Sequence, residues 1–203
     1  MIPLRHGAQP EELKEFLREN TEIQVQDFDS AKFQPIKVKI KETLLQLQNN
    51  QCVYCERTFS DINSMQVEHI KPKSGKNAHP DLCFTYTNYA ASCIQNTEKS
   101  KRTCGQNKSD KIIEIEPTSP DCNQMFMLNT EGEIHPISNI TKRQKHTVRS
   151  TVGTLGLNKP HLTLLRKKRI KNLISIIGLN PKAAKDYICS GDFPHILFKL
   201  DPK

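Results

Sequence analysis

A glutamate and a histidine stand side by side in the segment QVEHIKPKS, at the end of a short apolar run. A histidine with its usual pKa, such as His69, could accept a proton from water near neutral pH. The neighbouring Glu68 could give an oxygen ligand to a hard divalent ion such as Mg²⁺ or Mn²⁺. A base and a cation are what phosphodiester hydrolysis needs. Most single histidines are structural or merely exposed, so the rest of the chain must decide between these interpretations.

Cysteines stand on both sides of this segment. Cys52 and Cys55 form a CxxC pair, whose short spacer lets a tight turn direct both sulfurs to one tetrahedral ion. A redox pair has the same spacing, but the thioredoxin-like context is absent. We therefore predict a structural zinc site completed by Cys93 and Cys104. The alternative is that the last two are unrelated cysteines.

The remaining cysteines are given other roles. The chain has 7 cysteines, an odd number, which argues against a closed disulfide framework. Cys83 lies in an apolar-alternating stretch, DLCFTYTNY, and is expected in a strand as a small buried hydrophobe. Cys122 and Cys189 are expected to be structural or free. Cys93 follows Ala-Ala-Ser and is expected near the start of a polar helix.

The hydrophobic pattern predicts mainly helices outside the cysteine-rich segment. The segment from Gln51 to Lys111 is polar and rich in turn formers, so a metal would have to supply its folding energy. A hairpin is expected over Met125–Ile134, around a Glu-Gly turn. The expected helices are Pro10–Asn20, Ser30–Gln48, Lys142–Leu155 ending at Gly156, a helix capped by Asn158 and running from Pro160 to Gly178, and a last short one from Asn180-Pro181.

Positive charge is concentrated in the second half of the chain. The net charge is +8, and the run from Ile134 to Lys185 contains twelve Lys and Arg but no Asp or Glu. Such a run is either a solvated surface or a contact for a polyanion. We expect Arg166 and Lys167 to contact a nucleic-acid backbone. The N-terminus has no secretory signal pattern and no apolar run could cross a membrane, so we expect a cytoplasmic protein without membrane contact.

The order CVYCE, VEHIKPKS, TYTNYAASC and CGQNK resembles the HNH (His-Me finger) nucleases, over about residues 51–111. Their ββα-metal motif holds the active site between two zinc half-sites. The resemblance implies that His69 is the general base, that Glu68 binds the catalytic ion, and that Asn88 orients the histidine or braces the loop. It places Lys71 and Lys73 beside the scissile phosphate.

The third active-site position departs from the family pattern. Many HNH enzymes have Asn or His directly after the last zinc-site cysteine, as a second ligand of the catalytic ion. Gly105 stands at that position, and Asn107 is the expected substitute. Lys108, next in the same stretch, is expected to contact nucleic acid.

A narrower resemblance extends over about residues 37–171. The EHxxPKS stretch with a downstream LGLN-x4-L-x3-R helix is similar to the HNH subunit of Septu-type antiphage systems, including those linked to retrons. That family implies a toxic effector with an ABC-type ATPase partner (PtuA). In retron-linked versions it also implies a reverse transcriptase whose RNA–DNA product holds the effector in check. The substrate stays open between DNA and RNA, including tRNA.

The expected fold class is α+β, a mainly helical chain around a zinc-stabilised ββα-metal (HNH) core. Three segments are expected: residues 1–50 as an N-terminal helical segment, 51–111 as the core, and 112–203 as a hairpin followed by basic helices. The alternative function is a noncatalytic zinc module that binds nucleic acid or a protein. A self-contained restriction or homing enzyme is disfavoured because nothing resembles an added recognition domain.

Overall fold

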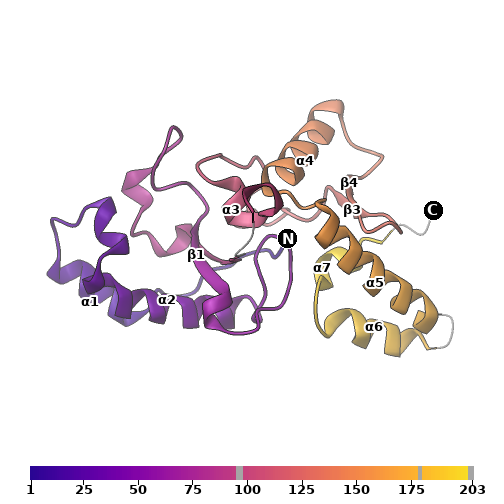
Figure 1. Ribbon diagram of the computed structural model, residues 1–203, viewed down its shortest axis with the longest axis horizontal. Helices are drawn as coiled ribbons and strands as arrows, with labels where there is room; N and C mark the ends of the chain where they lie inside the picture. Colours follow the sequence, from indigo (N-terminus) through magenta and orange to yellow (C-terminus); the bar gives the residue numbers. More distant parts are fainter. Residues whose placement is uncertain (95–97, 178–179, 201–203) are drawn as a thin grey trace.

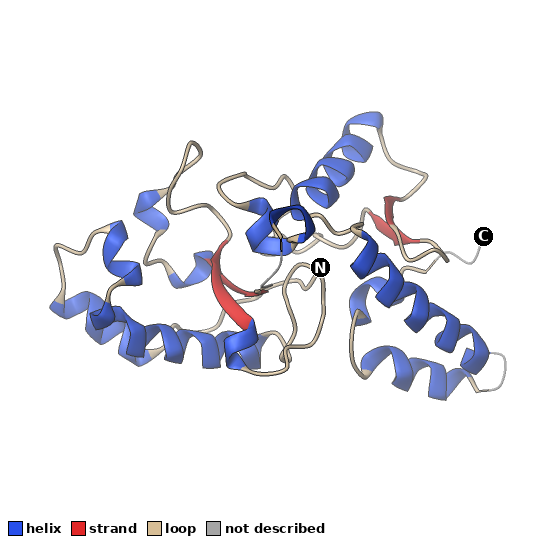
Figure 2. Cartoon of the chain, viewed as in Figure 1, coloured by secondary structure: helices blue, strands red, loops and turns tan. Residues whose placement is uncertain are grey.

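A computed structural model describes residues 1–94, 98–177 and 180–200 of the chain. The fold is α+β, with two small two-stranded sheets among helices, as expected (Figures 1 and 2). The strands are β1 (Met65–His69), β2 (Tyr89–Cys93), β3 (Phe126–Leu128) and β4 (Ile134–Pro136). The helices are α1 (Glu11–Glu19), α2 (Gln34–Leu47), α3 (Cys104–Lys108), α4 (Lys142–Leu155), α5 (Pro160–Ile177), α6 (Pro181–Cys189) and α7 (Pro194–Leu197).

Strands β1 and β2 form the antiparallel pair that carries the candidate site. Their register sets Met65 opposite Cys93 at one end and His69 opposite Tyr89 at the other. Every residue of β2 is buried. Because helix α2 packs against both strands, one face of the pair is covered by the N-terminal helices (Figure 1). The short apolar run before the Glu-His pair is thus a strand that ends at His69.

Aliphatic and aromatic side chains of α1 and α2 form a hydrophobic cluster with this strand pair. Leu13 of α1 and the α2 residues Ile40 and Leu44 are fully buried in it, together with Phe33. The two N-terminal helices predicted from periodicity are thus confirmed. The second of them begins later than expected, because a 3₁₀ turn occupies Ala31–Phe33 before α2.

The cysteine-rich segment differs from the prediction in two places. Cys93 ends strand β2 instead of starting a helix. Cys83 is fully buried as expected, but it follows a 3₁₀ turn over Pro80–Leu82 and lies in no strand. Periodicity failed here because side-chain hydrogen bonds from His69 and Tyr89 hold the carbonyl of Cys83, and alternation of apolar residues does not report on those.

The C-terminal half follows the prediction closely. Helix α4 has the predicted bounds, and Gly156 ends it in the left-handed conformation at φ 62°, which glycine adopts without cost. Strands β3 and β4 form the predicted hairpin, and the side chain of Asn180 accepts hydrogen bonds from the first turn of α6. Helix α5 extends to Ile177, and the predicted last residue, Gly178, lies outside the described residues.

One polar residue and one short helix of this half differ from the prediction. Asn158 does not cap α5; its side chain exchanges two hydrogen bonds with the backbone of Ile134 in β4. The α7 turn was missed, since four residues carry too little periodicity to be recognised. Within the described ranges, the structure has no helix long and apolar enough to cross a membrane.

Candidate active site and metal centre

Four cysteines from three parts of the chain meet in one buried cluster. The Sγ atoms of Cys52, Cys55, Cys93 and Cys104 lie within 4.8 Å of one another, and the sulfurs of Cys55 and Cys93 are 3.9 Å apart. Sulfurs bound to one tetrahedral zinc, each about 2.3 Å from the metal, are about 3.8 Å apart. The predicted set of four is therefore brought together, and its thiols and dimensions fit a structural metal such as zinc. Cys122 and Cys189 lie outside the cluster.

The imidazole of His69 lies in an aromatic setting on the face of β1 covered by the N-terminal helices. It makes edge contacts with Phe28 and Tyr89, at ring-centroid distances of 4.5 and 5.2 Å. Burial lowers the pKa of His69 to about 4, so the ring is neutral at pH 7. A neutral imidazole is the form that can accept a proton.

A hydrogen bond selects the tautomer of this ring. His69 Nε2 lies 2.9 Å from the carbonyl oxygen of Cys83, and a carbonyl can only accept, so Nε2 carries the proton. Nδ1 is then the basic nitrogen. The hydroxyl of Tyr89 donates to the same carbonyl at 2.7 Å, which holds the acceptor in place.

Asn88 braces the loop that follows the histidine. Its Oδ1 accepts from the backbone N–H of Lys71 at 2.8 Å, and its Nδ2 donates to the carbonyls of Lys71 and Leu82 at 3.0 and 3.2 Å. Leu82 precedes the residue whose carbonyl orients His69. Of the two roles considered for Asn88, the contacts are those of a loop brace that also supports the histidine's acceptor.

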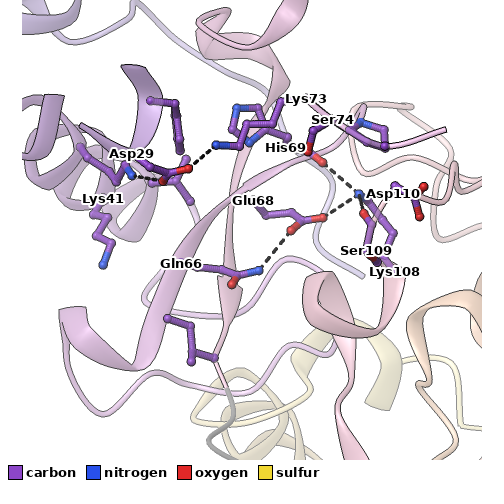
Figure 3. Close-up of a pocket in the computed structure, with 16 residues that line it drawn as sticks. Asp29, Lys41, Gln66, Glu68, His69, Lys73, Ser74, Lys108, Ser109 and Asp110 are labelled. Atoms are coloured by element: carbon purple, nitrogen blue, oxygen red, sulfur yellow. Dashed lines mark hydrogen bonds and ion pairs between the residues drawn. The ribbon is translucent and has the colours of Figure 1, made fainter. Parts of the chain in front are cut away.

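Glu68 and Lys108 form a buried ion pair on the opposite side of β1 from His69. The carboxylate is 6% exposed and the lysine 1% exposed, and Nζ lies 2.9 Å from Oε1. Gln66 donates to Oε2 at 3.2 Å. Burial raises the pKa of Glu68, an effect that the charge of Lys108 opposes. Lys108 was predicted to contact nucleic acid, but its ammonium is engaged inside the protein (Figure 3).

Gly105 has a packing role that the sequence did not reveal. A Cβ at this position would lie 2.1 Å from Glu68 Oε2 and 2.8 Å from Gln66 Nε2. The backbone N–H of Gly105 donates to Ser92 Oγ at 3.1 Å, tying α3 to β2. Any side chain at residue 105 would displace the carboxylate, so an Asn or His ligand is incompatible with this packing.

Asn107 does not replace the missing ligand. Its Nδ2 donates to the carbonyl of Thr154 at 2.9 Å, at the end of α4, and its Oδ1 accepts from Lys159 at 2.8 Å. The amide thus satisfies the C-terminal carbonyls of α4 and joins α3 to that helix. The prediction that Asn107 binds a catalytic ion beside Glu68 is not supported, since its side chain is committed elsewhere.

An open cleft of about 670 Å³ contains both His69 and Glu68 in its lining (Figure 3). Lys73, predicted to lie near the phosphate, also lines it. Lys71 does not: its ammonium pairs with Glu116 on another part of the surface. The side chains of a loop after a strand follow no regular alternation, so spacing alone could not show that Lys71 and Lys73 point to different parts of the surface.

The N-terminal segment supplies cleft residues that sequence reasoning missed. Lys37 and Lys41 of α2 line the cleft with Lys73. Asp29 accepts from Lys37 and Lys73 at 2.9 and 2.6 Å, and both ammonium groups lie over the ring of Phe28. Burial raises the pKa of Asp29, but the two lysines outweigh it and the pKa is lowered. No motif marks these residues, because the helix that carries them lies far from the His69 segment in the chain.

The two predicted cations of helix α5 have different surroundings. Arg166 is fully buried, and its guanidinium donates to the carbonyls of Gly132 and Leu157. It therefore faces the interior, contrary to the expectation that it contacts nucleic acid. Lys167 is exposed and pairs with Glu131. The contact of Lys167 with a nucleic-acid backbone stays a prediction.

Comparison with known proteins gives the chain a family. It is 47% identical over 205 residues to a Vibrio cholerae protein named "Retron Vc95 putative HNH endonuclease", covering 98% of this chain and 99% of that one. The chain belongs to the retron HNH endonuclease family. A Bacillus thuringiensis relative, named "Septu protein PtuB", is 33% identical over 119 residues, covering 58% of this chain and 42% of that protein. A scan of protein-family models found no match.

As a retron HNH endonuclease, the protein is a phosphodiester hydrolase whose catalytic groups are to be sought in the cleft. Of the residues quoted for the resemblance, His69 and Glu68 line this cleft, and Asn88 braces the loop that follows His69. The similarity to PtuB agrees with the narrower resemblance drawn from EHIKPKS and the LGLN helix.

Proposed function

We propose that the protein is the toxic nuclease of a retron- or Septu-type antiphage system, cleaving nucleic acid with His69 as general base. In this proposal β1, β2 and α3 are the ββα-metal core, and the four cysteines hold structural zinc. The observation that carries the assignment of the base is the hydrogen bond from His69 Nε2 to the Cys83 carbonyl, 2.9 Å long. It leaves an unprotonated Nδ1 on a ring that lines an open cleft.

The base needs no prior deprotonation step. With its pKa lowered to about 4 by burial, His69 is ready at neutral pH to take a proton from the attacking water at Nδ1. The Cys83 carbonyl stabilises the imidazolium that forms, because it keeps accepting from Nε2. Positioned general bases of this kind contribute about 10²–10⁴-fold to rate.

Whether a divalent ion fits this cleft depends on the oxygen atoms that now surround Lys108 Nζ. A carboxylate oxygen of Glu68 and the carbonyl oxygen of His69 lie 2.9 and 3.0 Å from that ammonium. Hard cations take such oxygens, and Mg²⁺ is often held by one carboxylate, waters and substrate phosphate. These donors are of the type that Mg²⁺ or Mn²⁺ takes, and Glu68 would be the protein ligand once the Lys108 ammonium has left its carboxylate. When bound, the ion would neutralise charge developing on the phosphate.

Nucleic acid would be held along the basic wall of the cleft. Lys37, Lys41 and Lys73 lie beside His69, and such backbone contacts are salt-sensitive and carry no sequence information. The two relatives' names include a retron and a Septu system. In this proposal the partners are those that the family resemblance implies, an ABC-type ATPase (PtuA) and a retron reverse transcriptase with its RNA–DNA product.

The test compares cleavage by the wild type and His69→Ala, with Mg²⁺ or Mn²⁺ and with the ATPase partner present and absent. Duplex DNA, single-stranded DNA and tRNA are offered as substrates. His146→Ala, an exposed histidine on α4, is the matched control. We expect loss of cleavage in His69→Ala alone, with unchanged zinc content. Equal cleavage by His69→Ala and wild type would reject the assignment of the base.

The competing function, a noncatalytic zinc module, makes the opposite prediction. Such a module would bind nucleic acid or a partner equally well with and without His69, and no preparation would cleave. A module also has no use for a neutral, oriented imidazole in an open cleft.

A further inference from the structure

Lys108 places a positive charge where the catalytic ion would be held. Its ammonium donates to Glu68 Oε1 at 2.9 Å, to the carbonyl of His69 at 3.0 Å and to the carbonyl of Ser109 at 3.3 Å. An ammonium has three donors, so this one is fully engaged. The side chain is 1% exposed, and a lysine is buried to this degree only when it is paired.

The oxygens around Lys108 are of the type that a divalent ion takes. A carboxylate and backbone carbonyls are hard donors, and they converge on one point in the cleft wall (Figure 3). Two cations cannot share this point, because they would repel each other and compete for the same lone pairs. The ammonium is therefore equivalent to a bound cation that the chain itself provides.

The neighbouring groups offer the ion no second position on this carboxylate. Oε2 accepts from Gln66 and faces Gly105, where no side chain can be added. Asn107 is bonded to α4 and Lys159. Oε1 accepts from both Lys108 and Tyr54, so an ion that binds this oxygen displaces the Lys108 ammonium, the group that holds the charge.

We propose that Lys108 is an internal competitor that keeps the divalent ion off Glu68 until its ammonium is drawn away by a phosphate of the nucleic acid in the cleft. This inference rests on the proposed function for its ion and substrate. Lys108 acts through Glu68, so it is a positioning residue. In the resting protein the ion binds weakly, and nucleic acid strengthens its binding by taking over the lysine's charge.

The test measures Mn²⁺ binding by electron paramagnetic resonance on the full chain with its zinc retained. Wild type, Lys108→Met and the double variant Glu68→Gln/Lys108→Met are compared. We expect Lys108→Met to bind Mn²⁺ at least tenfold more tightly than wild type, and the double variant to lose the site. A thermal shift gives a second readout: Mn²⁺ should raise the Tm of Lys108→Met, whose Glu68 is unpaired, and leave the double variant unchanged.

Two further variants keep the test decisive. Lys108→Gln retains hydrogen-bond donors without the charge and replaces Lys108→Met if that variant does not fold. Lys111→Gln removes an exposed lysine three positions away and should bind Mn²⁺ as the wild type does. Adding a short, uncleavable oligonucleotide should raise the Mn²⁺ affinity of wild type by a larger factor than that of Lys108→Gln, because in the variant the phosphate adds a ligand but displaces no ammonium.

Unchanged or weaker Mn²⁺ binding in both Lys108→Met and Lys108→Gln would overturn the proposal, because a competitor's removal must strengthen binding. The readout is independent of cleavage. If the wild type and the Lys108 variants cleave nucleic acid but the Lys108 variants bind Mn²⁺ no more tightly than wild type, only this inference is rejected and the proposed function stands. A gain in affinity without any cleavage by wild type rejects only the proposed function.

Discussion

Two buried clusters beside strands β1 and β2, the four cysteines and the Glu68–Lys108 pair, differ in how their negative charge is balanced. The four-cysteine cluster gathers four buried thiols, and the single positive charge of the buried Arg166, which interacts with Cys55 and Cys104, cannot balance four thiolates. The Glu68 position contains its own cation, Lys108. Ligands without an internal counter-charge depend on an external ion to fold, whereas a paired carboxylate is already satisfied. The first cluster therefore suits a structural ion, and the second suits the exchange of cations proposed above.

The largest effect should come from breaking the cysteine cluster. Cys52→Ser and Cys104→Ser should each lose the metal and most of the stability of the surrounding segment, because structural zinc contributes about 10–16 kcal/mol in small zinc-dependent units. Metal analysis and thermal melting check this. Cys189→Ser, at an exposed cysteine outside the cluster, should keep both metal and Tm. Full metal retention in both Cys52→Ser and Cys104→Ser would show that the cysteine cluster does not hold the metal.

Unpairing the internal cation should have the next largest effect. Glu68→Ala leaves the buried ammonium of Lys108 without its partner, at a cost of about 3–5 kcal/mol in the free energy of unfolding. The matched control is Glu131→Ala, which breaks the exposed pair with Lys167 and should cost about 0–1 kcal/mol. Denaturant unfolding of both variants measures the difference. Similar losses in the two would mean that Lys108 has a water-filled route out of its site.

A methyl group added at Gly105 should have a smaller effect on stability than the loss of the Glu68 carboxylate. Gly105→Ala forces a carbon into the space of Glu68 Oε2, and overpacking of this kind costs about 1–3 kcal/mol. Gly153→Ala, in α4, has nothing within 4 Å of the added carbon and should be neutral or stabilising. Thermal melts distinguish the two. A neutral Gly105→Ala would show that Glu68 and α3 can separate freely.

The smallest effect concerns the basic wall of the cleft. Lys41→Gln should weaken nucleic-acid binding by a few fold and reduce the salt slope by up to about 0.9, the value of one duplex phosphate contact. Lys39→Gln changes an exposed lysine on the same helix that pairs with Glu42 and does not line the cleft. Binding titrations at several salt concentrations measure both variants. Equal slopes for the two would place the nucleic acid elsewhere.

Elements with a strong local signal were predictable. Helix α4 has its predicted bounds because a capping box at Thr141 and Gln144 begins it and Gly156 ends it. The four cluster cysteines were also found, since the CxxC spacing is local and thiols have few other uses in such a chain. The inward face of α5 was not predicted: Leu162, Arg166, Ile170 and Leu173 are buried, although Arg166 was expected to contact nucleic acid. The carbonyls of Gly132 and Leu157 can satisfy its buried guanidinium.

The direction of charged side chains was not predictable. Lys71 and Lys73 are two residues apart, yet one pairs with Glu116 and the other lines the cleft with Asp29. Their partners lie more than forty residues away along the chain, so no local pattern specifies them.

By itself the sequence determined which chemistry is present: thiols for a soft ion, a histidine beside a glutamate for hydrolysis, and an excess of positive charge for a polyanion. Residue type and short spacing carry that information, because ligand preference and turn geometry are local. Only the tertiary structure decided which groups are free to act. It turned Asn107 to α4, buried Arg166 and set Lys108 on Glu68. Burial and pairing depend on contacts between distant segments, and those exist only once the chain has folded.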